Sequence, residues 1–300
     1  MITNASKNSI TRITNPSKQE FSQLWKQGIP FIIDGVASNW KACKNWSNDY
    51  LVSICGNNQV PVERYPENYF EGYNYAKLEN IHTTMTFAEY VGIVQDKKKD
   101  EHLYYLAQID MRKYFPQLME DIIFLDFFKK EPRDINLFFG FKNKDYASTS
   151  KLHFDDIHNI FVQIRGKKRF LLFPHINYLS FYPPIEDFNY SSTCSKVNPD
   201  EPDLKLFPKF PIHLKIEVIV NPGEILYIPP FWWHHVTTLN ENISLAFWYS
   251  PNIKDFWLQK GVFSAFLQFA PHVIPRFIRS QGKRSLVLDN EQKSKLQVNA

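Results

Sequence analysis

From about residue 135 the chain is a succession of short apolar runs separated by turn signals, and this pattern restricts the folds open to it. The runs are INLFFGF, HNIFVQIRG, KRFLLFP, KIEVIVNPGEILYIPP and HHVTTLNENISLAFWY. Runs of this length, rich in β-branched and aromatic residues and bounded by Gly, Pro or Asn, are typical of β-strands. Their spacing predicts an antiparallel barrel or sandwich.

Helical patterns flank this β-rich part on both sides. The stretch SKQEFSQLWKQ predicts an amphipathic helix that Ser17 caps and in which Glu20 completes a capping box. A short buried strand, PFIIDG, follows it. Further helical patterns cover 86–99 and 117–128, and the tail after Trp257 predicts one or two more helices.

These patterns together predict one composite α+β domain in three parts. An N-terminal helical and strand region, 1–134, packs on the barrel, 135–250 forms the barrel core, and 251–300 forms a helical C-terminal cap with a frayed tail. The chain has 300 residues, of which 44% are hydrophobic and 16% aromatic, and this is ample for a well-packed core.

The net charge and the cysteines give no indication of a nucleic-acid-binding, disulfide-rich or zinc-stabilised protein. The net charge is only +4 and the longest basic run is the Lys97–Lys99 triplet, so the sequence carries no electrostatic footprint for nucleic acid, although a local patch is not excluded. Three widely spaced cysteines, Cys43, Cys55 and Cys194, predict neither a disulfide framework nor a structural zinc site.

The apolar segments predict a soluble, cytoplasmic protein. The N-terminal stretch MITNASKNSITRITNPSKQE lacks the apolar region of a signal peptide. The most apolar segment, 256–278, is interrupted by Lys260, Pro271 and Pro275, and no stretch reaches the roughly 20 apolar residues that span a bilayer.

Polar side chains crowd the start of one predicted strand, in KLHFDDIHNIFVQIRG. On a strand, His153 and Asp155 would point to the same face, so they could bind one metal ion together. A third ligand could come from the histidine pair in FWWHHV, at the restart of a later strand, reaching across the barrel. Two histidines and one carboxylate on one side of a metal form the facial triad of non-haem Fe(II) oxygenases.

Each motif alone has a simpler interpretation. An HxD triplet usually lies in a solvated turn, and a histidine pair near aromatic residues is more often packed than bound to metal. The two motifs in this order, each on a strand of a β-rich region, favour the metal site. Zinc is the rival metal, because His and Asp suit it as well.

The segments LHFDDIHNIFVQIRGKKRFLLFP and NPGEILYIPPFWWHHV, followed by ISLAFWY, resemble the JmjC (cupin-like) family of Fe(II)- and 2-oxoglutarate-dependent oxygenases. The chain is most similar to the small hydroxylase branch, which includes an asparaginyl hydroxylase and a tRNA wybutosine hydroxylase. The similarity extends from PFIIDG to FWY and so covers most of the chain. It implies a double-stranded β-helix (jelly-roll) core, Fe(2+) as the metal, and 2-oxoglutarate and O2 as co-substrates.

The resemblance assigns the metal ligands to His153, Asp155 and His234. His234 is chosen over His235 because the ligand of the family directly follows the aromatic pair, and His235 would then point away on the other face of the strand. Lys168 matches the lysine that pairs with the distal carboxylate of 2-oxoglutarate, with Lys167 and Arg169 as rivals in RGKKR.

Further co-substrate contacts are implied at other positions. Asn159 matches a residue that hydrogen-bonds the co-substrate. Tyr105 and Ser150 occupy positions of hydroxyl donors to the same carboxylate, and Tyr104 and Thr149 lie one residue away. Ala246 departs from the pattern, because the asparaginyl hydroxylase has a second asparagine there.

Two other polar residues of the cluster are not implied as ligands. Asp156 is expected on the outer face or next to a ligand that it could orient. His158 is expected to alternate away from Asn159 along the strand.

The resemblance implies an enzyme that oxidises a C–H bond, and hydroxylation of a peptide or protein side chain is the function we expect. The chain lacks the additional zinc-binding Cys/His cluster of many histone demethylases. N-methyl demethylation, tRNA-base hydroxylation, a non-catalytic cupin-like binding protein, and a zinc- or manganese-dependent cupin isomerase or hydrolase are the alternatives. Nucleic acid and membrane partners are not expected.

Two segments outside the motifs carry expectations about partners. The long insertion 188–211 could form a wall of the substrate site. In relatives, C-terminal helices form a dimer interface, and the apolar segment 253–278, which includes Phe256, Trp257 and Phe263, therefore predicts a homodimer. The alternative is a helix packed on its own barrel.

Overall fold

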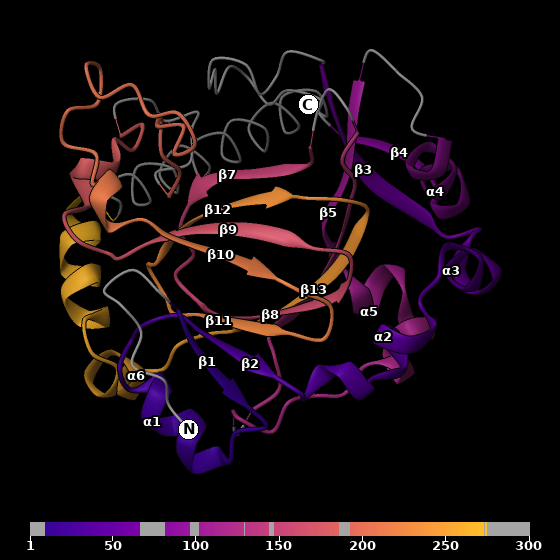
Figure 1. Ribbon diagram of the computed structural model, residues 1–300, viewed down its shortest axis with the longest axis horizontal. Helices are drawn as coiled ribbons and strands as arrows, with labels where there is room; N and C mark the ends of the chain where they lie inside the picture. Colours follow the sequence, from indigo (N-terminus) through magenta and orange to yellow (C-terminus); the bar gives the residue numbers. More distant parts are fainter. Residues whose placement is uncertain are drawn as a thin grey trace, which may run out of the picture.

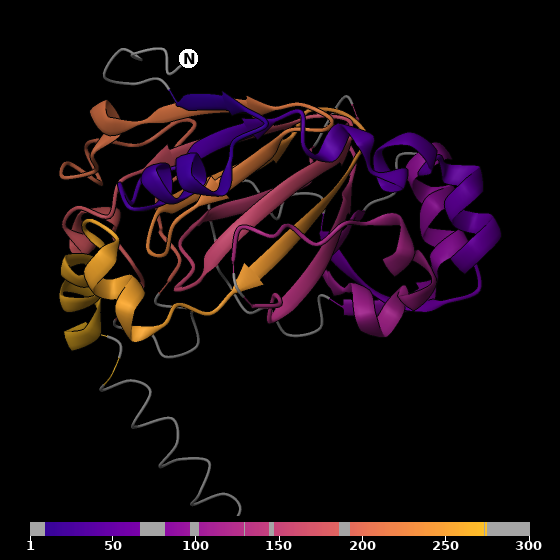
Figure 2. The ribbon, with the colours of Figure 1, turned by 90° about the horizontal axis from the view of Figure 1, so that it is seen from below.

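Two β-sheets, antiparallel except for the parallel β1–β2 pair, face one another at the centre of the computed structural model (Figures 1 and 2). The structure describes residues 10–66, 82–96, 102–128, 130–143, 147–185, 193–272 and 274. The smaller sheet has the strand order β10-β9-β12-β7, and the larger has the order β1-β2-β11-β8-β13-β6-β5-β3-β4. Helices α2, α3 and α4 lie at one end of the two sheets and α6 at the other (Figure 1).

The strands have these bounds: β1 Thr11–Thr14, β2 Phe31–Asp34, β3 Gln59–Pro66, β4 His82–Thr86, β5 His102–Asp110, β6 Asp134–Gly140, β7 Thr149–His153, β8 His158–Arg165, β9 Lys168–Phe173, β10 Ile216–Val220, β11 Ile225–Ile228, β12 Trp233–Thr238 and β13 Asn242–Tyr249. The helices are α1 Lys18–Trp25, α2 Lys41–Asn45, α3 Asn48–Cys55, α4 Phe87–Asp96, α5 Met111–Tyr114 and α6 Ile253–Leu258. Short 3-10 helices are η1 Ala37–Asn39, η3 Pro116–Asp121, η4 Tyr178–Phe181 and η5 Ile212–Leu214.

From β6 to β13 each strand lies in the other sheet from the one before it, except that β9 and β10 are neighbours in the smaller sheet. Strands β6, β8, β11 and β13 lie in the larger sheet, whereas β7, β9, β10 and β12 make up the smaller one. Eight antiparallel strands distributed over two facing sheets in this way form a double-stranded β-helix, so the expected α+β jelly-roll fold is confirmed. Strands β1 to β5, which precede residue 134, extend the larger sheet at both edges. The division of the chain at residues 134 and 250 stays a prediction.

Strand alternation explains how the core is filled. On β9, Phe170 and Leu172 are buried between the two sheets, against Phe161 of β8. The intervening Leu171 and Phe173 pack on the outer face with Val262 from a helical segment at 262–272. The smaller sheet is therefore covered on both faces, which accounts for its continuous apolar runs.

The tight turn between β8 and β9 sets the register of β9. Gly166 adopts φ +67, which other residues rarely take, and a Cβ there would lie 2.1 Å from the carbonyl oxygen of Glu241. This position therefore requires glycine. The turn brings Lys168 to the first position of β9.

The N-terminal expectations are met closely. Helix α1 is capped by Ser17, and Glu20 completes the capping box in both directions. The PFIIDG strand is β2, whose first three residues are fully buried. The pattern at 86–99 corresponds to α4, and the Lys97–Lys99 triplet lies outside the described residues. The tail is helical at α6 and again at 262–272.

The helix predicted at 117–128 is wrong. A 3-10 helix, η3, ends at Asp121, and the chain then continues without a helix to Phe128. The side chain of Asp121 is buried and accepts hydrogen bonds from Trp46 Nε1 at 2.9 Å and Tyr50 OH at 2.8 Å. The apolar residues that follow pack against the core without helical periodicity, so tertiary contacts override the local pattern.

None of Cys43, Cys55 and Cys194 forms a disulfide within the described ranges. Among the described residues, no helix has the length and apolar character needed to cross a membrane.

The Asp121 contacts generate a test of the fold. We expect Asp121→Ala to lower the free energy of unfolding by about 2–4 kcal/mol, because it leaves two donors without their acceptor in a buried site. Urea denaturation monitored by circular dichroism measures the change. Glu120→Ala, at an exposed neighbouring position, is the control and should change stability by less than about 0.5 kcal/mol. Equal stability of the two variants would contradict the structural role of Asp121.

Candidate metal centre and adjoining cavity

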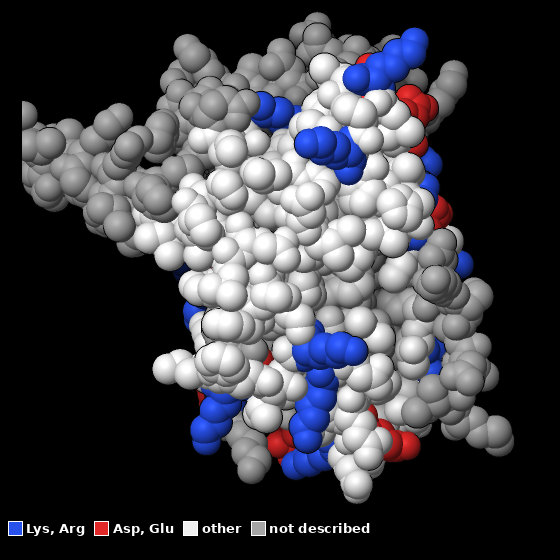
Figure 3. Space-filling model, turned by 90° about the vertical axis from the view of Figure 1, so that its left-hand side faces the viewer, with Lys and Arg blue, Asp and Glu red and all other residues white. Residues whose placement is uncertain are grey.

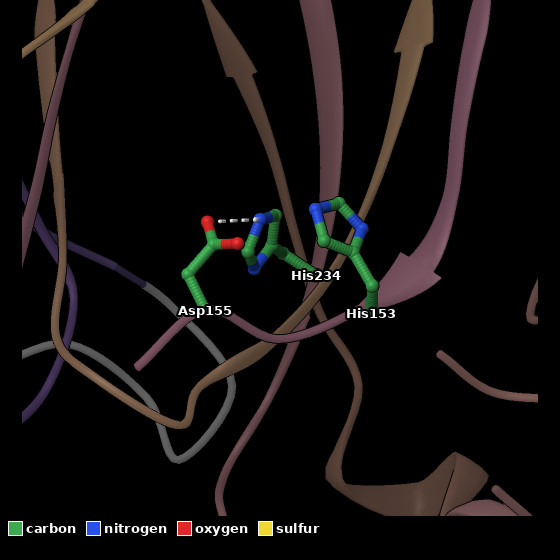
Figure 4. Close-up of side chains that lie close together, drawn as sticks. All are labelled: His153, Asp155 and His234. Atoms are coloured by element: carbon green, nitrogen blue, oxygen red, sulfur yellow. Dashed lines mark ion pairs between the residues drawn. The ribbon is translucent and has the colours of Figure 1, made fainter. Parts of the chain in front are cut away.

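Two neighbouring strands of the smaller sheet bring three possible metal ligands together (Figure 4). His153 ends β7, and His234 on β12 is its direct cross-strand partner. Asp155 follows β7 and presents Oδ2 3.6 Å from His234 Nε2. One ligand atom from each of the three residues lies within 4.8 Å of the others, which is a spacing that a single metal ion could bridge.

Two details of this arrangement differ from the expectation. The strand stops at His153, so Asp155 is not a second strand residue on the same face. Its position after the strand is fixed instead by its carbonyl oxygen, which accepts a hydrogen bond from the Phe231 amide at 2.7 Å. His234 also does not reach across the barrel, because β12 and β7 are adjacent strands.

A backbone carbonyl orients each histidine ring. Nδ1 of His153 lies 2.6 Å from the oxygen of Lys151, and Nδ1 of His234 lies 2.9 Å from the oxygen of Trp232. A carbonyl oxygen only accepts, so both Nδ1 atoms carry the proton. The Nε2 atoms therefore keep their lone pairs, as metal-binding histidines require.

The electrostatic environment keeps His234 neutral. Burial and the neighbouring His153 lower the pKa of His234 to about 4, although Asp155 acts in the opposite direction. Two neutral imidazoles and a carboxylate suit a divalent ion of the first transition row, and this donor set fits both Fe(II) and Zn(II).

The three residues open into a cavity of about 410 Å³ between the two sheets. Its walls come mainly from β5, β6, β7, β8, β9, β12 and β13, with β3 at one side and residues 193 and 194 at the rim. The apolar part of the lining is aromatic to a large extent, and two buried polar atoms there, Asn159 Oδ1 and Trp248 Nε1, have no hydrogen-bond partner among the described residues. Such orphaned atoms indicate that the cavity takes a polar ligand.

Lys168 is the most unusual group in this cavity. Its side chain is 1% exposed, and its ammonium group lies 3.1 Å from Tyr105 OH and 5.0 Å from the centre of the Phe138 ring. No carboxylate pairs with it in the described part of the chain, and burial lowers its pKa to about 7. A buried cation without a counter-ion is costly unless an anion binds beside it.

The rivals of Lys168 lie elsewhere. Lys167 is exposed, and Arg169 forms an ion pair with Asp200. Because Lys168 alone among the three lines the cavity, the structure separates it from its neighbours.

The other predicted contacts fall on the same cavity. Asn159, Ser150 and Tyr105 all line it, and so does Thr149, whereas Tyr104 belongs to the core behind β5. Ala246 also lines the wall. Their roles toward a co-substrate stay predictions.

The remaining polar residues of the motifs face away from the cavity. Asp156 is exposed. His158 is fully buried on the other side of β8, where it contacts Tyr227 OH at 2.9 Å and Asp255 Oδ2 at 3.2 Å. His235 is directed to Asp200, with His235 Nε2 and Asp200 Oδ2 3.3 Å apart.

Apart from Tyr105 of β5, the sequence analysis did not identify the wall formed by β3 and β5. Glu63 and Tyr65 of β3 line the cavity, as does Gln108 of β5. Gln108 has φ +55 where the pairing of β5 with β6 shifts register, so a β-bulge shapes this side of the cavity. The alternation of Glu63 and Tyr65 in VPVERYP was the available signal for their shared face.

Comparison with known proteins adds independent information. Residues 17–255 match the cupin-like domain family. The chain is 29% identical over 252 residues to lysine-specific demethylase 8 of Xenopus tropicalis, covering 82% of this chain and 54% of that protein. It is 32% identical over 255 residues to JmjC domain-containing protein D of Dictyostelium discoideum, covering 79% and 55%.

A third relative is covered over more of its length. The human tRNA wybutosine-synthesizing protein 5 is 28% identical over 260 residues, which cover 80% of this chain and 77% of that protein. The chain spans about half the length of the first two relatives. The matched family and the double-stranded β-helix agree, and the chain therefore belongs to the cupin-like (JmjC) domain family.

Proposed function

We propose that this protein is an Fe(II)- and 2-oxoglutarate-dependent oxygenase that hydroxylates a C–H bond of a peptide or protein side chain. The observation that carries the proposal is the pairing, in one cavity, of a His-Asp-His cluster with a buried lysine that has no acidic partner among the described residues. A metal explains the cluster and a dianionic co-substrate explains the lysine. A zinc hydrolase or isomerase would leave the Lys168 charge unexplained.

In this proposal His153, Asp155 and His234 hold the iron. The two imidazoles offer Nε2 lone pairs that the Lys151 and Trp232 carbonyls keep in place. Iron(II) together with 2-oxoglutarate would supply the activation of dioxygen needed to oxidise the substrate, and 2-oxoglutarate would be converted to succinate and carbon dioxide. The aromatic walls contributed by Phe138, Phe161 and Phe170 limit the access of water to the oxidant.

Lys168 and its neighbours hold the co-substrate. The Lys168 ammonium group pairs with the distal carboxylate, to which Tyr105 OH and Ser150 donate hydrogen bonds. Asn159, which lies on the same wall, donates a hydrogen bond from its side-chain amide nitrogen to the co-substrate.

Metal binding tests the proposed ligands directly. We expect His153→Ala and His234→Ala to weaken binding of Fe(II), or of Co(II) as a probe, by at least about 100-fold, since even changes behind a ligand cost 10–100-fold. Anaerobic equilibrium dialysis with elemental analysis measures the affinity. His213→Ala, at an exposed histidine, is the matched control. Wild-type affinity in both ligand variants would contradict the assignment.

The low pKa of Lys168 predicts how pH affects 2-oxoglutarate binding. In the free protein the pKa of Lys168 is about 7, so above pH 7 its amine is mostly neutral. A bound carboxylate raises this pKa, and binding of 2-oxoglutarate above pH 7 therefore takes up a proton. The affinity should then fall by up to about tenfold per pH unit above 7. Calorimetry in buffers of different ionisation enthalpy measures the uptake.

Two variants make this prediction specific to Lys168. Lys168→Met should weaken 2-oxoglutarate binding by about 100-fold and abolish the proton uptake, because loss of one partner of a buried ion pair costs about 2–5 kcal/mol. Lys167→Met, at the exposed neighbour, should do neither. Proton uptake that persists in Lys168→Met would assign the effect to another group.

Hydroxylation and demethylation leave different products. We expect peptides from a cell lysate to gain the mass of one oxygen atom, dependent on 2-oxoglutarate and the enzyme, when analysed by mass spectrometry. Formaldehyde release with loss of a methylene mass would favour N-methyl demethylation, and oxidised tRNA nucleosides would favour the RNA alternative.

The insertion predicted at 188–211 is described from residue 193 onward. Its residues Thr193 and Cys194 line the cavity and support the role of the insertion as a substrate wall.

We also propose the cytoplasm as the site of action and a homodimer as the assembly. Ile253, Trp257 and Leu258 of α6 are exposed by more than half of their surface. The middle of this side of the molecule is largely uncharged, and charged side chains lie above and below it (Figure 3). Val262 and Ala265 are buried against the barrel, so part of the segment packs on its own chain. The side chain of Phe256 and residues 275–278 lie outside the described part. Light scattering at micromolar concentration distinguishes a dimer from a 35.5 kDa monomer.

A further inference from the structure

Aromatic residues next to the candidate metal ligands pack on the outer face of the smaller sheet. Phe154 lies between His153 and Asp155 in the sequence. Trp233 directly precedes His234. Both aromatic side chains are buried in the outer cluster, and their ring centres lie 4.9 Å apart. Because successive residues of an extended chain project to opposite sides, contacts that fix these two rings also fix the direction of the ligand side chains.

Phe231 joins the same cluster with an unusual backbone conformation. Its φ is +66, in the left-handed region that costs free energy for any residue other than glycine. In this conformation its amide donates the hydrogen bond to the Asp155 carbonyl oxygen, and its ring centre lies 5.8 Å from that of Phe154. Such a conformation persists only where the surrounding contacts impose it.

The C-terminal helical segment, 262–272, supplies such contacts through Phe269. The centre of the Phe269 ring lies 5.0 Å from that of Phe154 and 5.9 Å from that of Phe231. Ala265, one helical turn earlier, is buried in the same cluster, so this face of the segment rests on the outer side of the sheet.

A further contact connects Phe269 to the strand that carries His234. The Tyr178 ring meets the Phe269 ring edge-on, with the centres 5.8 Å apart. The same Tyr178 ring is stacked on that of Trp233, with the centres 6.2 Å apart. Aromatic pairs at such separations stabilise a structure beyond the apolar area that they bury. Phe269 therefore bears on the residues beside all three candidate ligands.

We infer that the C-terminal helical segment, through Phe269, positions the metal ligands from the outer face of the smaller sheet. Phe269 holds Phe154, which sets the direction of the ligand on either side of it. Phe269 also holds Phe231, whose amide fixes the Asp155 backbone. Phe269 does not line the cavity as the described residues form it, so it is a positioning residue and not a catalytic one. The inference rests on the proposed function, in which the three ligands hold iron.

Docking of this segment and metal binding are then coupled in both directions. If the docked segment raises the affinity for metal, bound metal must stabilise the docked segment by the same factor, because linkage between binding free energies is reciprocal. The wild-type protein alone can therefore reveal the coupling.

Hydrogen exchange of the wild-type protein measures this coupling. The backbone amides are followed by mass spectrometry with and without Co(II), under nitrogen and without 2-oxoglutarate. We expect Co(II) to slow exchange in peptides that cover 262–272 by about tenfold, within the usual range of coupling between two sites. Peptides from α4, which lies at the far end of the sheets, serve as the control and should not change (Figure 1).

Three variants assign the coupling to Phe269. Phe269→Ala should weaken Co(II) binding by about tenfold and alter the visible absorption spectrum of the Co(II)-saturated protein, which a mere loss of stability would not change. Phe269→Leu keeps an apolar side chain at the contact and should restore most of the affinity. Leu267→Ala, at a position of the same segment that is 53% exposed, is the matched control and should behave as the wild-type protein.

The possible failures are distinguishable. Exchange in 262–272 that Co(II) leaves unchanged, or slows no more than in α4, overturns the inference even if a variant does not fold. Wild-type affinity and spectrum in folded Phe269→Ala overturn it as well. Absence of Co(II) binding by the wild-type protein would instead remove the proposed function on which the inference rests.

Discussion

The antiparallel pairing of β7 with β12 is the interaction on which the site depends. It places His153 opposite His234, so two distant parts of the sequence supply neighbouring imidazoles. The same pair of strands lies beside β9, whose pairing with β12 aligns Lys168 with Thr238. The turn that contains Gly166 fixes the start of β9. The register of the smaller sheet therefore determines the positions of both the metal cluster and the buried lysine.

The charged groups of the cavity differ in what balances them. The His234–Asp155 pair would share a metal, whereas Lys168 has only a hydroxyl partner within the described structure. In a site of low polarity, such a group favours a ligand of the opposite charge. We interpret the cavity as arranged for an anion at Lys168, in the same cavity as the three candidate metal ligands.

The strands of the core and the motif residues could be predicted from sequence because they follow strong local rules. Short apolar runs bounded by turn residues identified β6, β8 and β9, and strand alternation correctly separated His158 from Asn159. The helix expected at 117–128 failed because the buried Asp121 contacts fix a short 3-10 turn. Glu63 was missed because its place in the cavity wall arises from β3 pairing with β5, and local sequence carries no information on that long-range pairing.

The central claim is that the His-Asp-His cluster supports oxidative decarboxylation of 2-oxoglutarate. The most direct measurement is succinate formation from 2-oxoglutarate, with Fe(II) and dioxygen, by the wild-type protein and by variants of His153 and His234. We predict iron- and dioxygen-dependent succinate from the wild-type protein, and a loss of at least about 100-fold in both variants. No succinate from the folded wild-type protein, or undiminished succinate from His153→Ala, would contradict the account.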